Sequence, residues 1–134
     1  MSPLLTLTQP PVGVVCLETL IIVALMDLTL NCYSDKGHKI WSAKISHAIT
    51  CVQRIQLKQK NQELIATGLQ NGSVNFYTVS GECVDQVEFN EPISAVYFGQ
   101  YGRESNSLIV VTQGWFIIKL FFNFWWIIVK KLRF

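Results

Sequence analysis

The stretch from Glu63 to Phe89 reads ELIATGLQNGSVNFYTVSGECVDQVEF and contains three strand-like runs joined by two tight turns. Asn71-Gly72 separates the first run from the second, and Ser80-Gly81 separates the second from the third. Asn-Gly between apolar runs is a strong hairpin signal, because both central residues of a type I′ turn need positive φ. The stretch therefore predicts an antiparallel meander. Since three strands cannot bury both faces alone, further copies of the unit are expected in the chain.

Short apolar runs rich in β-branched and aromatic residues recur outside this stretch, from Val12–Leu17 to Leu108–Thr112. Turn signals separate them at intervals of about 8–12 residues, which is typical of all-β proteins. A helical period of 3.6 residues is not sustained anywhere over two turns. The sequence therefore predicts an all-β fold.

A repeat appears when the chain is shifted by 44 positions. Leu30–Ser34 then falls on Val74–Thr78, and Leu20-Ile21 falls on Leu64-Ile65. The same shift brings Leu64-Ile65 onto Leu108-Ile109, and it brings Val74 and Phe76 onto Ile118 and Leu120. Repeats of about 40–50 residues with four strands each are the signature of propeller blades.

We therefore expect a partial β-propeller with two four-stranded antiparallel blades, at about residues 12–45 and 49–89. Most of a third blade would follow at 93–120, and an apolar tail of uncertain structure at 121–134. A propeller closes with 4–8 blades, which predicts a fragment of a longer protein whose outer faces favour aggregation. The blade around Glu63–Phe89 would be the best ordered, because it is flanked on both sides.

Composition excludes several classes of protein. The 134 residues carry a net charge of only +2 and no basic stripe before the C-terminus, which argues against nucleic acid. The four cysteines have no Cys-x-x-Cys spacing; two disulfides are conceivable, but buried free thiols are favoured because no secretory signal is evident. Glu18 interrupts the apolar segment Val12–Met26, which we interpret as two strands and not as a targeting signal.

The end of the chain allows two interpretations. Gly114–Phe134 is strongly aromatic, and Lys130, Lys131 and Arg133 follow its apolar run, as in a membrane anchor. The run is shorter than the ~20 residues that span a bilayer, and Lys119 is costly within it. The other interpretation makes Trp115–Leu120 a propeller strand. A small membrane-tethered β protein thus remains the alternative to a scaffold fragment.

Catalytic and cofactor motifs are missing from the sequence. It contains no phosphate-binding glycine loop, no Gly-x-Ser-x-Gly elbow and no Cys/His cluster with zinc spacing. His38 and His47 are isolated. We therefore expect no enzyme activity and no cofactor. The candidate protein-interaction residues are Tyr101, Arg103 and Glu104, in a long loop from Gly99 to Asn106, because Tyr and Arg are enriched at interfaces; a merely solvated surface loop is the alternative.

Three segments, Asp35–Trp41, Ala66–Val74 and Phe98–Ile109, resemble the N-terminal β-propeller of the Bardet–Biedl syndrome 1 family. Phe98-Gly-x-Tyr-Gly-Arg-Glu104 is the most specific of them, and the resemblance runs from about Leu7 to Lys119. It ends after Leu120, which marks the tail as an aberrant end.

The resemblance implies a non-catalytic subunit of the BBSome, a coat-like complex in ciliary membrane-protein trafficking and cilium assembly. It implies other BBSome subunits and a GTP-loaded Arf-like small GTPase as partners, and ciliary receptors such as Smoothened and Patched as cargo. Membrane contact would be mainly indirect. The expected localisation is the cytoplasm, the cilium, the ciliary membrane and the centrosome or basal body region.

Overall fold

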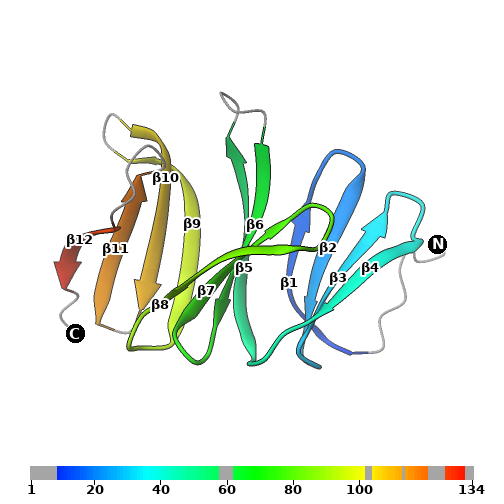
Figure 1. Ribbon diagram of the computed structural model, residues 1–134, viewed down its shortest axis with the longest axis horizontal. Coiled ribbons are helices and arrows are strands. Elements are labelled where there is room, and N and C mark those ends of the chain that lie inside the picture. Colours follow the sequence, from blue (N-terminus) through cyan, green and yellow to red (C-terminus); the bar gives the residue numbers. More distant parts are fainter. Residues whose placement is uncertain (1–8, 58–61, 102–103, 113, 121–125, 132–134) are drawn as a thin grey trace.

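The computed structural model describes residues 9–57, 62–101, 104–112, 114–120 and 126–131. Three four-stranded sheets stand side by side in an arc (Figure 1). The first contains β1 (Pro11–Cys16), β2 (Leu20–Leu25), β3 (Thr29–Ser34) and β4 (Lys39–Lys44). The second contains β5 (Ile49–Leu57), β6 (Gln62–Leu69), β7 (Ser73–Thr78) and β8 (Cys83–Glu88). The third contains β9 (Ile93–Tyr101), β10 (Glu104–Thr112), β11 (Trp115–Leu120) and β12 (Trp126–Lys131).

Every neighbouring pair of strands within a sheet is antiparallel and follows chain order, as in propeller blades. The predicted all-β, blade-like fold is thus confirmed. The third sheet differs from the expectation, because β12 pairs with β11 and adds a fourth strand from within the predicted tail. We refer to the three sheets as blades 1, 2 and 3.

The tight turns follow one design that differs from the predicted type I′ turn. Gly72 has φ 94° and its N–H donates to the carbonyl of Leu69, 3.1 Å away. Among the described residues outside glycine, only Leu28 has positive φ, so Asn71 does not. This is a three-residue loop with glycine in the left-handed position. The side chain of Asn71 instead accepts a hydrogen bond at Oδ1 from the N–H of Ser73, 3.1 Å away.

The 44-residue repeat between blades 1 and 2 extends to single backbone hydrogen bonds. Gly37 N–H donates to Ser34 O and Gly81 N–H to Thr78 O, each at 3.0 Å. At the other end of the blades, Ile45 N–H donates to Leu28 O at 2.7 Å, and its equivalent Phe89 N–H donates to Gly72 O at 2.8 Å. The repeat therefore describes a shared backbone geometry as well as a hydrophobic pattern.

The repeat slips in blade 3, contrary to the uniform offset expected from the sequence. Arg54 pairs with Ile65 in blade 2, whereas its equivalent Phe98 pairs with Leu108. Leu108 is therefore the counterpart of Ile65, 43 positions away, and not of Leu64. The reason is that the β9–β10 hairpin is one residue shorter than the β5–β6 hairpin of blade 2. Matching of apolar residues along the sequence does not detect this difference. A slip of one residue exchanges the two faces of a strand.

A second shift occurs at β11. Phe76 pairs with Ala66, and Ile118 pairs with Ile109, so Ile118 takes the place of Phe76 and not of Val74. The prediction of a propeller strand at Trp115–Leu120 is correct, but its register differs from the 44-residue offset.

The hydrophobic core lies between the blades. One cluster joins Ile22, Leu30 and Cys32 of blade 1 to Ile65 and Tyr77 of blade 2. A second cluster joins blades 2 and 3, and its buried members are Ile55, Leu57, Leu64, Ala66, Val74, Phe76, Ile93, Val96, Leu108 and Val110. Blade 2 is thus covered on both faces. Burial of these side chains is the main stabilising contribution that the sheets receive from one another.

Candidate protein-interaction site

The residues predicted for interaction lie where β9 meets β10. Tyr101 is the last residue of β9 and Glu104 is the first of β10, and the two are paired. Arg103 lies outside the described residues. The expected long loop from Gly99 to Asn106 is wrong, because the strands continue almost to their turn. The register shifts between Glu104, which pairs with Tyr101, and Ser107, which pairs with Gly99.

The correction has a physical reason. A polar segment rich in glycine carries little strand propensity, but neighbouring backbones can continue their ladder of hydrogen bonds whatever their side chains are. Blade 2 has an equivalent hairpin, in which β5 and β6 stay paired as far as Leu57 and Gln62. The repeat therefore predicts that β9 and β10 also stay paired almost to their turn. The ends of β5 and β9 lie at the same upper margin of the molecule in Figure 1.

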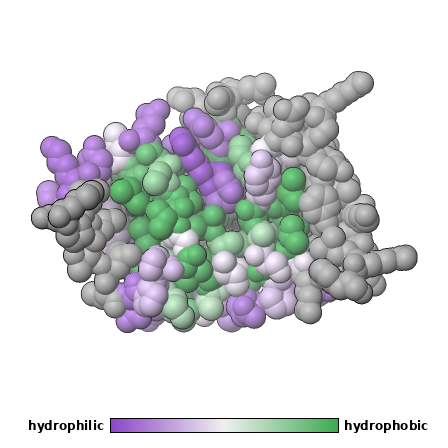
Figure 2. Space-filling model, turned by 180° about the vertical axis from the view of Figure 1, so that it is seen from behind, coloured by the Kyte–Doolittle hydropathy of each residue, from purple (hydrophilic) through white to green (hydrophobic). Residues whose placement is uncertain are grey.

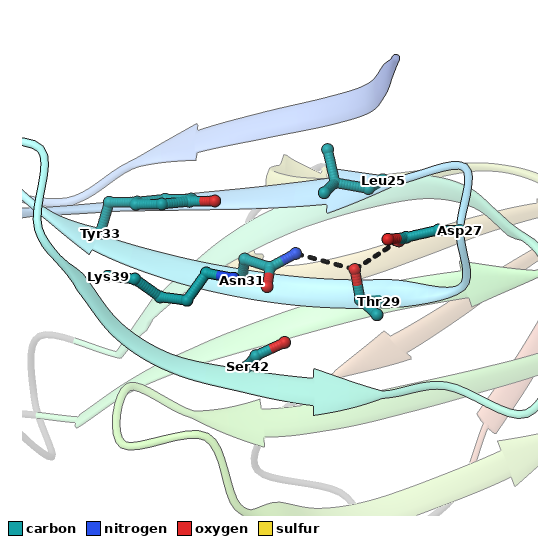
Figure 3. Close-up of a pocket in the computed structure, with 7 residues that line it drawn as sticks. All are labelled: Leu25, Asp27, Thr29, Asn31, Tyr33, Lys39 and Ser42. Atoms are coloured by element: carbon teal, nitrogen blue, oxygen red, sulfur yellow. Dashed lines mark hydrogen bonds between the residues drawn. The ribbon is translucent and has the colours of Figure 1, made fainter. Parts of the chain in front are cut away.

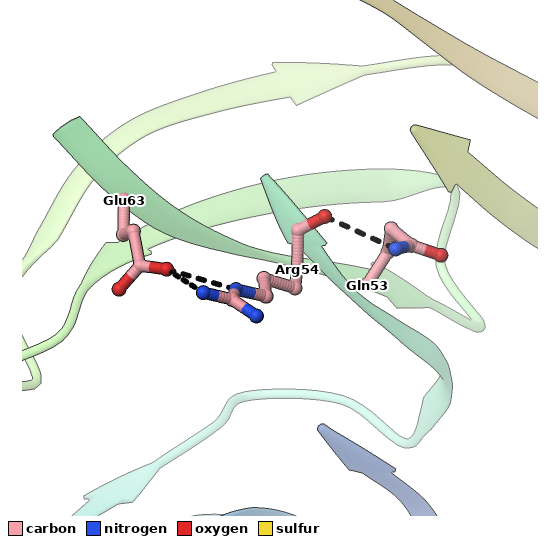
Figure 4. A network of polar contacts seen from close by, with 3 residues as sticks. All are labelled: Gln53, Arg54 and Glu63. Atoms are coloured by element: carbon pink, nitrogen blue, oxygen red, sulfur yellow. Dashed lines mark hydrogen bonds and ion pairs between the residues drawn. The ribbon is translucent and has the colours of Figure 1, made fainter. Parts of the chain in front are cut away.

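An ion pair holds the base of the β5–β6 hairpin (Figure 4). Arg54 donates to Glu63 Oε1 from Nε at 2.8 Å, and its Nη2 contacts the same oxygen. Gln53 donates from Nε2 to the carbonyl of Arg54 at 3.0 Å. The two charged side chains are 28% and 29% exposed, so solvent screens the pair and its contribution to stability is small.

A polar hollow that sequence reasoning missed lies on blade 1 (Figure 3), with a volume of about 260 Å³. Asn31 donates from Nδ2 to Thr29 Oγ1 at 2.8 Å, and Thr29 donates to Asp27. The hollow is lined by Leu25, Asp27, Thr29, Asn31, Tyr33, Lys39 and Ser42. The 44-residue repeat matches Asn31 and Tyr33 to Asn75 and Tyr77, which are buried in blade 2, so the repeat gives no signal for a hollow.

The chemistry of the hollow is hydrogen bonding. It combines one carboxylate, one ammonium group, three hydroxyl groups and one amide, without a nucleophile paired to a base. Among the described residues, no group of three or more His, Cys, Asp and Glu side chains could hold a metal ion. Within the same part of the chain, no helix is long and apolar enough to cross a membrane.

The cysteines are all free, as favoured from the sequence, but only some are buried. Cys32 is buried and Cys51 is half-buried, whereas Cys16 and Cys83 are exposed, which corrects the expectation of four buried thiols. Burial raises the pKa of Cys51, and hydrogen bonds from Thr50 and the backbone oppose this in part. Burial also raises the pKa of Tyr77. Neither group is poised as a nucleophile.

The side opposite to Figure 1 combines two kinds of surface (Figure 2). Hydrophobic side chains gather in its middle, and hydrophilic ones gather along its upper margin. Exposed apolar patches with a polar border are typical of protein-interaction surfaces.

Comparison with known proteins gives the fold and a specific relative. No protein-family model matches the chain. The curated proteins BBSome complex member BBS1 of Homo sapiens and of Mus musculus are each 27% identical over 108 residues, 81% of the chain. A crystal structure of BBS1N in complex with ARL6DN is 33% identical over 80% of the chain, with a TM-score of 0.75. The chain resembles the N-terminal propeller of BBS1.

The resemblance to BBS1 covers a limited part of that protein. The chain spans 18% of the length of the two curated BBS1 proteins and 33% of the BBS1N chain in the crystal. The WD40 repeats of RRP9 match with a TM-score of 0.71 at only 14% identity, over 96% of the chain and 40% of theirs. This second likeness shows the propeller fold alone, whereas the likeness to BBS1 extends to the sequence.

Proposed function

We propose that the chain is a non-catalytic scaffold and interaction module of the BBSome, acting in ciliary membrane-protein trafficking and cilium assembly. The observation that carries the proposal is the 33% identity, at a TM-score of 0.75, to BBS1N crystallised with ARL6DN. The arc of blades without a catalytic constellation among the described residues is consistent with this role. Trp126–Lys131 form a strand of blade 3, so nothing specific favours the alternative of a membrane-tethered protein.

The proposed partners are other BBSome subunits and an Arf-like small GTPase in its GTP form. Smoothened and Patched are proposed as cargo of the assembled complex, with the cilium, ciliary membrane and basal body region as its location. We place the blades of the module at about residues 12–45, 49–89 and 93–120, as expected from the sequence, with β12 from within the expected tail of residues 121–134 added to the third blade.

Titration of the purified chain with ARL6 tests the proposal. We expect binding when the GTPase carries a non-hydrolysable GTP analogue and at least about tenfold weaker binding when it carries GDP, a difference of about 1.4 kcal/mol. A folded chain that binds neither ARL6 nor any BBSome subunit would contradict the proposal. Calorimetry gives the affinities directly.

The candidate hairpin is tested by alanine substitution. Because Tyr and Arg side chains supply most of the energy in many interfaces, Tyr101→Ala combined with Arg103→Ala and Glu104→Ala is expected to weaken GTPase binding at least about tenfold. Asp85 and Glu88 are exposed on β8, away from this hairpin, and their alanine variants serve as controls. Equal affinities for the two variants would remove the hairpin from the proposed interface.

A further inference from the structure

The outer strand of blade 2, β8, is exposed although both neighbouring blades are in place. Blades 1 and 3 pack against the two faces of blade 2, yet every residue of β8 except the half-buried Val87 is exposed. In the part of the chain that the structure describes, no strand pairs with the outer edge of β8. Figure 1 shows β8 crossing in front of β5, β6 and β7. The edge is therefore accessible to another molecule.

The backbone of β8 offers hydrogen-bonding groups to a further strand. The N–H of Phe89, directly after the strand, donates to Gly72 O of the same blade at 2.8 Å. Since the backbone groups of successive residues point to opposite edges of a strand, those of Glu88 and Gln86 point outward. The Gln86 N–H agrees with this, because it donates to Asp85 Oδ1, 2.8 Å away, and not to β7. Such outward groups are a template for an added strand.

The surroundings of this edge are negatively charged. Between Lys60 and Arg103 the sequence contains acidic residues but no Lys or Arg. Glu82, Asp85 and Glu88 lie in or directly before β8 and are exposed. Within the described residues, none of these three carboxylates forms an ion pair. Charge complementarity therefore favours a cationic partner at this edge.

The outer strands of the other two blades carry the opposite charge. β4 contains Lys39 and Lys44 and no acidic residue. β12 contains Lys130 and Lys131 and no acidic residue. Charged side chains on an edge strand discourage indiscriminate pairing, and like charges placed opposite each other are destabilising. A cationic segment is thus directed to β8 and disfavoured at β4 and β12.

Val84 adds an apolar contact beside the edge. It is 52% exposed and lies next to the register shift between Phe76 and Tyr77. β4 has the same irregularity, between Cys32 and Tyr33. Because such irregularities interrupt the ladder of hydrogen bonds, two of these edges from separate copies of the chain would match poorly. An extended segment without a fold of its own can adapt to the edge, and this favours it over a second copy.

We propose that β8 binds an extended segment of another protein, rich in lysine or arginine, which adds to blade 2 as a fifth strand. Main-chain hydrogen bonds to Gln86 and Glu88 hold the segment, as in other cases of strand addition. A carbonyl of the segment replaces Asp85 at the Gln86 N–H, and the released carboxylate meets a cationic side chain. An apolar residue of the segment contacts Val84. The inference rests on the fold and charge of blade 2 and not on GTPase binding.

Fluorescence anisotropy with labelled peptides and the full chain tests the inference. Two peptides of about eight residues, a usual strand length, alternate valine with lysine or valine with glutamate. The lysine peptide is expected to bind at least about tenfold more tightly than the glutamate peptide. A lysine peptide with every amide nitrogen methylated cannot donate to β8 and is expected not to bind. A purely ionic contact would survive this methylation.

Charge reversal locates the site. Asp85→Lys combined with Glu88→Lys is expected to weaken binding of the lysine peptide at least about tenfold. Glu18→Lys combined with Asp35→Lys is the matched control, because it makes the same charge change at exposed residues of blade 1. Far-UV circular dichroism checks that both variants are folded.

Several results would overturn the inference. They are a lysine peptide that does not bind at about 1 mM, equal affinities for the lysine and glutamate peptides, and binding that survives methylation or the reversal on β8. Self-association of the wild-type chain that the same reversal abolishes would make the occupant a second copy. The GTPase is proposed to bind at the β9–β10 hairpin, so failure of one interaction is measured separately from failure of the other.

Discussion

At the scale of single residues, Leu28 stands out for its backbone. It adopts φ 68°. This left-handed conformation costs any residue other than glycine about 1–2 kcal/mol, because the Cβ atom lies too close to the following carbonyl oxygen. Its counterpart in the next blade is Gly72, at φ 94°. The Leu28 carbonyl accepts a hydrogen bond from the N–H of Ile45, just after the last strand of blade 1. The Gly72 carbonyl accepts the equivalent bond from Phe89, just after the last strand of blade 2. The three-residue turn is therefore kept in blade 1 with a residue that does not favour it.

Leu28→Gly is expected to stabilise the protein by about 1 kcal/mol, because glycine adopts positive φ without the steric penalty. Loss of the half-buried leucine side chain, with its hydrophobic contacts, offsets part of this gain in stability. Urea denaturation measures the change in the free energy of unfolding. The reverse test is Gly72→Ala, since an added Cβ would overlap the carbonyl oxygens of Phe89 and Glu91. We expect a loss of about 2 kcal/mol there, and a stabilising Gly72→Ala would refute the account.

Cys51 gives a prediction about pH. Burial raises the pKa of its thiol in the folded protein, so the unfolded chain ionises first as pH rises. The stability that depends on the neutral thiol is complete below the unfolded pKa of about 8.5 and is lost as pH rises through the folded pKa. Thermal unfolding from pH 7 to pH 10 should show this loss, and Cys51→Ala should reduce its slope. An unchanged slope would exclude Cys51 as a source.

At the scale of elements, the outer strand β4 does more than complete its sheet. Trp41 reaches from β4 to the β7–β8 turn, where its indole N–H bonds Val79 O at 2.9 Å. Its ring covers Gly81, so that a Cβ there would lie 2.8 Å from it. This contact joins blade 1 to blade 2 at the rim, whereas β1 and β5 join them near the inner strands.

Trp41→Phe retains an aromatic ring but removes the indole donor, which leaves Val79 O without this partner. Net hydrogen bonds of this kind contribute about 1 kcal/mol, and we expect a destabilisation of that size in urea denaturation. Ile40→Ala is the control, because Ile40 is 54% exposed next to Trp41 and should change stability by less than about 0.5 kcal/mol. Equal effects of the two substitutions would mean that the bond contributes nothing.

At the scale of the whole molecule, the described residues form an arc in which blades 1 and 3 cover both sides of the middle blade. Burial follows this arrangement, because β7 has five buried residues in a row, from Ser73 to Tyr77, although strands alternate their faces. The outer strand β8 is exposed along most of its length. Stability should therefore be unequal along the chain.

Amide hydrogen exchange is expected to be slowest in β6 and β7, whose hydrogen bonds open only with blade 2 itself. Exchange in β8 should be faster, because one edge of this strand faces solvent. Mass spectrometry of peptides from the deuterated protein measures both. Protection of β2 and β3 above that of β6 and β7 would show that blade 1, and not blade 2, is the most stable part.

Much of this architecture is present in the sequence. The Asn71-Gly72 and Ser80-Gly81 signals, the strand boundaries of blade 2 and the match between blades 1 and 2 are all local, since glycine in a turn and alternating apolar residues act within a few neighbours. The resemblance around Phe98–Glu104 pointed to BBS1 for the same reason. What remained hidden was the geometry of the candidate site, because Tyr101 and Glu104 are brought together by strand pairing and not by a motif.

The sequence by itself determined the kind of blade, the number of copies and the family likeness, because each is written in side chains that repeat at a nearly constant spacing. Only the tertiary structure decided the register of β10 and β11, the fourth strand of blade 3 and the exposure of β8. The physical reason is that hairpin length and inter-blade packing select among pairings that differ by one residue, and both depend on strands that are distant in the chain.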